Sequence, residues 1–183
     1  EGHGVDAIIA QGLEAGGHRG HFLDMDISRQ LGTFALLPQI IAAVRLPLEA
    51  FLTVPPGSGK RPLVVFPHGG PIGVADRLHF DREVQFVASL GYAVLQVNFR
   101  GSDGYGRAFR EAAYGAFGTR IEDDIDAAIT AALARHPLDG DRMCMLGASY
   151  GGYAALMGAT KTPDLFQCAI SFAGMSDLVK MSN

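Results

Sequence analysis

The most constraining feature of the sequence is the run 146–153, in which a serine lies between glycines directly after an apolar segment. Gly147 and Gly151 stand two positions before and after Ser149. This spacing is typical of a nucleophile elbow, a sharp turn from a strand into a helix that needs small residues where the two approach. The turn strains the backbone at the serine and lifts its hydroxyl above a sheet. We therefore expect Ser149 to be a nucleophile at the end of a buried strand.

From about residue 61 onward, short apolar runs alternate with helical patterns, which predicts a mostly parallel sheet with right-handed crossovers. The expected strands are 63–66, 92–99, 143–146 and 168–172, and the expected helices are 77–90, 120–135 and 150–160. An edge-type strand is expected at 48–54, before a Pro/Gly turn. Together these elements predict a three-layer α/β sandwich.

The first 45 residues have a different character. Residues 5–10 are predicted to be a strand and residues 34–44 a helix, with a polar loop of glycine and histidine between them. That is a single βα unit. We therefore expect two parts, residues 1–46 and residues 47–183.

Charge and hydropathy exclude several classes of partner. The net charge of −4 and the pI near 5.8 lack the basic footprint of a nucleic-acid-binding protein. No apolar stretch approaches the ~18 residues that suggest a membrane span. The chain opens with Glu-Gly-His-Gly, so no signal peptide is expected.

The two cysteines, Cys144 and Cys168, each lie inside an apolar, strand-like run. This placement favours two buried free thiols in a reducing compartment, and hence a cytoplasmic location. A disulfide or a metal pair is the alternative.

Three motifs follow one another in the second part: His68-Gly69-Gly70-Pro71, then Asn98 to Gly106 with its glycines, then the elbow. With these motifs, residues 47–183 resemble the catalytic domain of the prolyl oligopeptidase family of serine peptidases, nearest its acylaminoacyl-peptidase branch. The resemblance implies a partial α/β-hydrolase fold with its strands in the order second, first, third, fourth, counting from Leu63. It also implies peptidase or esterase chemistry on a small ester or peptide substrate.

An oxyanion hole needs two preorganised N–H donors near the attacked carbonyl. The residue after the nucleophile, Tyr150, is expected to supply one, and the resemblance implies that Gly70 supplies the other. A plain strand-ending turn is the alternative role of the loop that contains Gly70.

The base is the difficulty. In this fold the triad follows the chain order serine, acid, histidine, yet the six histidines (residues 3, 18, 21, 68, 79 and 136) all precede Ser149. We therefore expect the acid and histidine to be missing and acyl transfer to be weak or absent. His68 is a candidate substitute base because its loop lies near the elbow, with a structural role in that loop as the alternative. His18 is a second candidate.

Arg100 and Tyr105 are candidates for a substrate pocket. Arg100 would bind a carboxylate or carbonyl of a peptide-like substrate, against the alternative of a structural salt bridge. Tyr105 would shape an acyl pocket or pack its own loop. The glycines near Lys60 and Ser102 match neither a phosphate loop nor a dinucleotide fingerprint, and no Cys/His spacing suggests zinc. We expect no cofactor and no metal for this chemistry.

Residues 4–46 resemble a different family, the FMN-dependent nitronate monooxygenases, through the runs 4–12, 14–20 and 32–39. By this resemblance His18 matches an active-site histidine, and the βα unit comes from a TIM-like barrel, of whose eight units only one is covered. The chain thus looks like a chimera with its junction near residues 46 and 47. A folded chimera without catalysis and a flavin-binding fragment are the alternatives to a serine hydrolase.

The last expected strand, around Ile170, is expected to be a bare sheet edge with an apolar face. Because such edges pair with other strands, we expect a homodimer or a domain-swapped oligomer.

Overall fold

The computed structural model describes residues 48–178. The chain divides into two units, Glu1–Pro47 and Leu48–Asn183. The strand expected at 5–10, the helix expected at 34–44 and His18 lie outside the described residues.

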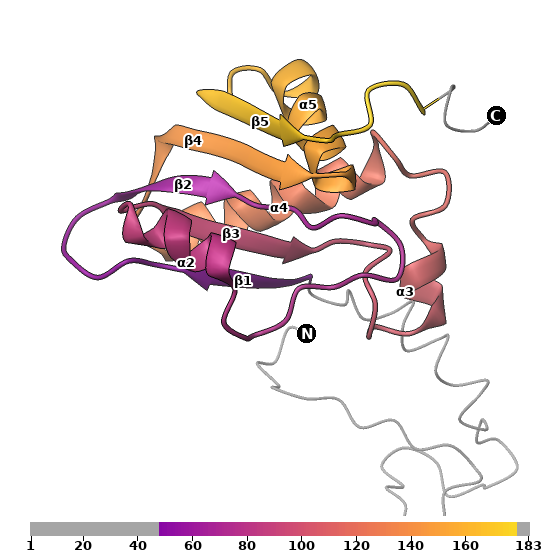
Figure 1. The fold of residues 1–183 in the computed structure, drawn as a ribbon, viewed down its shortest axis with the longest axis horizontal. Coiled ribbons are helices and arrows are strands. Elements are labelled where there is room, and N and C mark those ends of the chain that lie inside the picture. The colour runs from indigo at the N-terminus through magenta and orange to yellow at the C-terminus, as the bar shows by residue number, and fades with distance from the viewer. Residues whose placement is uncertain (1–47, 179–183) are drawn as a thin grey trace, which may run out of the picture. The chain divides into compact units, whose positions relative to one another are not determined.

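Five strands form one mixed sheet in the order β1-β3-β2-β4-β5 (Figure 1). Their bounds are β1 (Glu49–Thr53), β2 (Arg61–Val65), β3 (Ala93–Asn98), β4 (Leu138–Ala148) and β5 (Cys168–Phe172). The last four run parallel to their neighbours, and β1 is antiparallel to β3. This arrangement confirms the predicted order of the four parallel strands and the edge position of β1.

The described helices are α2 (Arg82–Ser89), α3 (Arg107–Glu111), α4 (Arg120–Arg135) and α5 (Tyr150–Lys161). Helix α4 has the predicted bounds. Helix α2 begins later than predicted because the Asp81 carboxylate accepts the N–H groups of Glu83 and Val84, which makes Asp81 the N-cap. Helix α3 was not predicted, since five residues are too few to show a helical period. Within residues 48–178, no helix is both long enough and apolar enough to cross a membrane.

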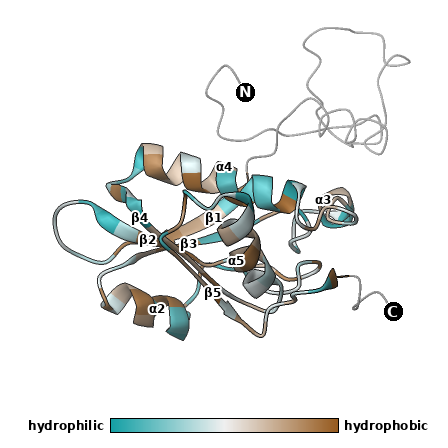
Figure 2. Cartoon of the chain, turned by 90° about the horizontal axis from the view of Figure 1, so that it is seen from above, coloured by the Kyte–Doolittle hydropathy of each residue, from teal (hydrophilic) through white to brown (hydrophobic). Residues whose placement is uncertain are grey.

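The order of the strands decides which face each helix covers. From β2 the chain crosses through α2 to β3, which lies on the β1 side of the sheet. It then returns across the sheet in the opposite direction, to β4 and on to β5. Right-handed crossovers therefore place α2 on one face and both α4 and α5 on the other. Figure 2 shows α2 and α4 on opposite sides of the sheet. The predicted three-layer sandwich is confirmed.

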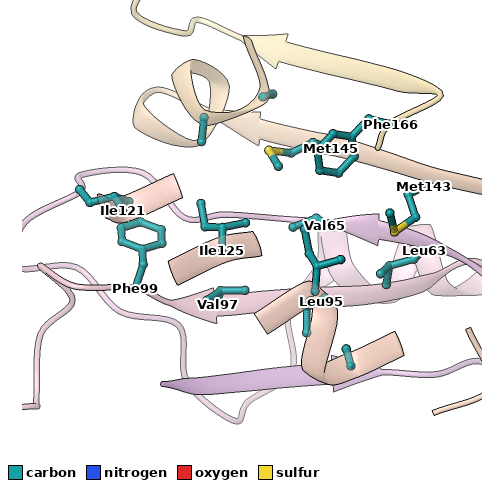
Figure 3. Close-up of a cluster of buried hydrophobic side chains, with 14 of the residues drawn as sticks. Leu63, Val65, Leu95, Val97, Phe99, Ile121, Ile125, Met143, Met145 and Phe166 are labelled. Carbon is teal, nitrogen blue, oxygen red and sulfur yellow. The ribbon is translucent and has the colours of Figure 1, made fainter. Parts of the chain in front are cut away.

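The core lies between the sheet and α4 (Figure 3). Ile121, Ile125 and Ile129 form the apolar stripe of α4, and each is at most 1% exposed. They pack in one cluster with strand residues such as Leu95 and Met143. Full burial of a side chain of this size contributes about 1.5–3 kcal/mol. This packing holds the carboxyl ends of β2, β3 and β4 side by side.

Strands β4 and β5 are joined by a disulfide between Cys144 and Cys168, which are direct partners in the ladder. The prediction of two free thiols was therefore wrong. Each cysteine lies in an apolar run, as expected, but the parallel register brings their Cα atoms to 4.7 Å. That separation falls within the range a disulfide spans. The cytoplasmic location had rested on the free thiols, and it stays a prediction.

Strand β5 is the edge of the described sheet, and all five of its residues are exposed. Ile170 is 50% exposed and Phe172 is 73% exposed. We expect a second copy of the chain to pair with this edge, because an unpaired strand with apolar side chains is a template for another strand.

Light scattering after size exclusion tests this expectation. Replacing Ile170 with lysine should shift the mass toward that of a monomer, since a charge at an open edge opposes pairing. Tyr114→Lys is the matched control, because Tyr114 is also exposed but lies outside β5. A monomeric wild-type chain at all concentrations would contradict a homo-oligomer.

Candidate active site

Ser149 lies between the end of β4 and the start of α5, with φ 55° and ψ −118°. Among the described residues other than glycine, only Ser149 and Ala173 have a positive φ. Such a backbone costs about 1–3 kcal/mol and is found mostly where function requires it. The serine is exposed, as an attacking hydroxyl must be. The geometry is that of the predicted elbow, and the nucleophilic role of Ser149 stays a prediction.

The two flanking glycines are required by close backbone contacts. A Cβ added at Gly147 would overlap the backbone of Gly151, and one added at Gly151 would overlap the carbonyl oxygen of Pro67. Helix α5 thus starts against Pro67, two residues after the end of β2. This approach brings the elbow beside the glycine loop.

The loop after β2 reaches the nucleophile through Gly69. A Cβ built on Gly69 would lie 3.6 Å from the Cβ of Ser149. Gly70 has φ 119°, a conformation that favours glycine, and precedes a cis bond to Pro71. On the other side of the serine, the N–H of Tyr150 belongs to the first turn of α5, where the helix leaves N–H groups unpaired. The loop and the helix start are therefore neighbours, and the assignment of Gly70 and Tyr150 as oxyanion donors stays a prediction.

His68 does not face the serine. Its Nδ1 lies 2.7 Å from the carbonyl oxygen of Gly69 and its Nε2 2.9 Å from the hydroxyl of Ser102. The ring stacks on Phe99 with 4.3 Å between centroids. Burial lowers the pKa of the His68 imidazole. The Gly69 carbonyl can only accept, so Nδ1 is the donor in that contact. The Ser102 hydroxyl donates to the carbonyl oxygen of Phe99 at 2.7 Å.

Both nitrogens of His68 thus have partners other than Ser149, which agrees with the structural alternative, and its role as a substitute base stays a prediction. Within residues 48–178, no histidine is hydrogen-bonded to the serine.

Arg100 is engaged by Asp124 of α4. Its Nε and one terminal nitrogen donate to the two carboxylate oxygens at 2.7 and 2.6 Å, and its backbone N–H donates to the same group. The hydrogen bonds from Arg100 to Asp124 raise the pKa of the guanidinium further. This bidentate pair ties the loop after β3 to α4 and agrees with the structural alternative, while substrate binding by Arg100 stays a prediction.

Tyr105 joins a polar network at the carboxyl end of β3. Its hydroxyl donates to the carboxylate of Glu49 and accepts from the amide of Asn98 at 2.8 Å. Burial, followed by the hydrogen bond to Glu49, raises the pKa of Tyr105 to about 12. The ring also packs on Phe109, with 5.1 Å between centroids. Tyr105 thus packs its own loop and also lines an open pocket.

That pocket has a volume of about 500 Å³ and is lined by acidic and apolar side chains together with Arg77. Its members include Glu49, Phe51, Asp76, Asp103 and Tyr105. Strand β1, which contributes Glu49 and Phe51, stands three places from β4 in the sheet, or about 14 Å across the strands. The assignment of Tyr105 to a substrate pocket stays a prediction.

Asp76 was not singled out by the sequence. Its Oδ1 accepts from the side-chain amide of Gln96 at 3.0 Å, while its Oδ2 is buried without a partner among the described residues. Burial raises the pKa of Asp76 to about 6. No local pattern signals this residue, since its burial depends on a loop folding over β3.

This pKa predicts a dependence of stability on pH. A carboxyl with a raised pKa favours the folded state fully below its unfolded value, 3.8, and this contribution is lost as pH rises through about 6. Urea unfolding at several pH values should show the wild type losing about 1–2 kcal/mol relative to Asp76→Asn between pH 4 and 7, after allowance for solvent screening. Asp103→Asn, an exposed acid at the same pocket, is the control. Parallel pH profiles for the wild type and Asp76→Asn would refute the assignment.

Comparison with known proteins adds two family matches. The model described as "Prolyl oligopeptidase family" matches residues 78–183, and the model described as "Nitronate monooxygenase" matches residues 1–51. Both resemblances inferred from the sequence are confirmed by these matches.

Relatives of known sequence or structure agree with the first match. Dipeptidyl aminopeptidase BIII of Pseudoxanthomonas mexicana is 39% identical over 140 residues, covering 72% of this chain and 20% of that protein. Acylamino-acid-releasing enzyme 1 of Oryza sativa subsp. japonica is 30% identical over 165 residues, covering 90% of this chain and 20% of that protein. A puromycin-hydrolyzing peptidase of Mycobacterium tuberculosis superposes with a TM-score of 0.69 at 35% identity, covering 75% of this chain and 22% of that one. The chain therefore spans about a fifth of the length of the relatives it matches.

Proposed function

Because the chain belongs to the prolyl oligopeptidase family, we propose that it carries the nucleophile of a serine peptidase or esterase, with Ser149 attacking the carbonyl carbon of a small ester or peptide. The observation that carries the proposal is the strained backbone of Ser149, an exposed serine between two glycines that backbone contacts require.

In the proposed step, Ser149 Oγ bonds to the carbonyl carbon while its proton passes to a base. The carbonyl oxygen becomes an oxyanion held by the N–H groups of Tyr150 and Gly70. The leaving alcohol or amine then departs as the carbonyl re-forms, and water hydrolyses the acyl-enzyme.

Turnover by this chain should be weak. With His68 bound to Gly69 and Ser102, the described residues offer the serine no imidazole base. A serine hydroxyl without a base is a poor nucleophile, although an oxyanion hole and binding still leave about 10³–10⁴-fold over water in dismantled triads.

A fluorophosphonate probe followed by intact-mass measurement tests the proposal. We expect a slow, stoichiometric adduct on the wild type and none on Ser149→Ala, because the probe reacts with a serine held beside an oxyanion hole. Ser176→Ala, a described serine outside the elbow, should label like the wild type. No adduct after prolonged incubation would mean that the elbow is only architecture and that the chain is a folded chimera without catalysis.

A second candidate, flavin binding, is favoured only by the match of residues 1–51 to nitronate monooxygenase. It concerns the segment that contains His18. Purified protein that absorbs in the flavin bands would support it, and colourless protein would remove it.

A further inference from the structure

Glu122 is a buried acid beneath the nucleophile elbow. It lies in the first turn of α4, where acids normally face solvent and favour the helix dipole. Here the side chain is only 5% exposed. Its Oε1 accepts a hydrogen bond of 2.9 Å from the hydroxyl of Tyr150, while its Oε2 has no hydrogen-bond partner in the part of the chain that the structure describes.

Tyr150 connects this acid to the reaction centre. It follows Ser149 directly and is the first residue of α5. Its side chain is fully buried, and its ring packs on Phe99 and Phe117, with centroids 5.8 and 5.2 Å away. The phenolic hydroxyl is the one polar group of this side chain, and Glu122 is its partner. Ring packing and the hydrogen bond together fix the residue whose N–H stands beside the serine.

Glu122 is held at a cost to stability. Burial raises the pKa of its carboxyl, although its own backbone N–H, the Tyr150 hydrogen bond and nearby Lys161 oppose that shift. Lys161 forms its ion pair with Asp123 at 2.8 Å, so it does not pair with Glu122. Asp123 adds repulsion. An apolar residue at this position would avoid the desolvation of a carboxyl, so stability alone does not explain a glutamate here.

We propose that Glu122 is a positioning residue for the elbow, which acts through the Tyr150 hydroxyl to fix the N–H that follows Ser149. The proposal rests on the proposed function, since the orientation of that N–H matters only where an oxyanion forms. It adds to that function a residue on a different helix, 27 positions before the serine.

Saturation kinetics of fluorophosphonate labelling on the full chain give the first test. Glu122→Leu removes the acceptor at similar size, and we expect its maximal labelling rate to fall about tenfold, less than the 10²–10³-fold that loss of an oxyanion donor costs. The probe concentration at half-maximal rate should not change. Glu122→Gln keeps an acceptor for the Tyr150 hydroxyl and should restore the rate to within about twofold. Asp126→Asn, a half-buried acid on the same helix, should label like the wild type.

Tyr150→Phe tests the same hydrogen bond from its other partner, so the proposal can still be tested if a Glu122 variant fails to fold. It removes only the donated hydrogen bond and should slow labelling to the level of Glu122→Leu. The double variant should be no slower than either single one, because both remove the same interaction. Additive losses, or slowing that Glu122→Gln does not restore, would overturn the positioning role.

An amide spectrum separates this proposal from the proposed function. The chain has five tyrosines, so ¹⁵N-tyrosine labelling gives few resonances, and Tyr150→Phe identifies the one lost. Glu122→Leu should shift the Tyr150 resonance, while Glu122→Gln and Asp126→Asn should leave it in place. If Glu122→Leu shifts the Tyr150 resonance but the wild-type chain is never labelled by the probe, the positioning by Glu122 is supported and the chemistry at Ser149 is rejected. An unshifted resonance in Glu122→Leu would reject the positioning whatever the labelling shows.

Discussion

Replacing Gly151 with alanine is expected to cost more than about 4 kcal/mol, enough to unfold a domain of ordinary stability. The added Cβ would overlap the carbonyl oxygen of Pro67, which is backbone and has no rotamer to move into. Relief requires α5 to move away from the end of β2. That movement separates Ser149 from the loop that contains Gly69. Urea unfolding followed by circular dichroism measures the loss, and fluorophosphonate labelling should disappear with it.

Gly158→Ala in the same helix is the matched control. Its Cβ would contact only side-chain atoms of Phe166 and Met145, at 3.0 Å or more. Those side chains can adjust, and alanine is the better helix former by about 1 kcal/mol. We therefore expect Gly158→Ala to unfold close to the wild type. If Gly151→Ala did so as well, the close approach of α5 to β2 would not be required by the fold.

Reducing the Cys144–Cys168 disulfide is expected to lower the unfolding free energy by about 3 kcal/mol. The bond closes a loop with a sequence separation of 24, and cross-linking a loop of this length restricts the unfolded chain by about that amount. The disulfide also links β5 covalently to β4, and burial stabilises β5 little because every residue of that strand is exposed. Strand β5 in turn supports the elbow, since the carbonyl of Phe172 accepts the N–H of Ser149 at 3.0 Å.

Urea unfolding with and without a thiol reductant measures the effect of the disulfide. The double variant Cys144→Ser with Cys168→Ser should resemble the reduced wild type and should not respond to reductant. Equal unfolding midpoints for oxidised and reduced wild-type protein would show that the disulfide contributes nothing to the stability of β5.

Most of the fold was predictable from the sequence because its signals are local. The alternation of apolar runs and helical stripes predicted the strands, and the family resemblance implied their order. Helix α4 was predicted to the residue, since its isoleucines recur at helical spacing. The elbow was predictable for the same reason. The small residues that the turn requires, Gly147 and Gly151, lie within five positions that include Ser149.

The partners of the site residues were not predictable, because they come from distant elements. His68 and Arg100 were both candidates for chemistry, and each proved to be bound elsewhere, to Ser102 and Asp124 respectively. A side chain's motif says what it is able to do, whereas its partner depends on which loops the sheet brings together. For Arg100 that partner lies 24 positions further along the chain.

The sequence by itself determined the strand–helix alternation and the strained serine, because periodicity and glycine spacing act over a few residues. Only the tertiary structure decided that Cys144 faces Cys168 and that Glu122 lies under Tyr150. Both pairings depend on the register of parallel strands and on the face of the sheet that a helix covers. Those are properties of the assembled layers, and no single segment of the chain contains them.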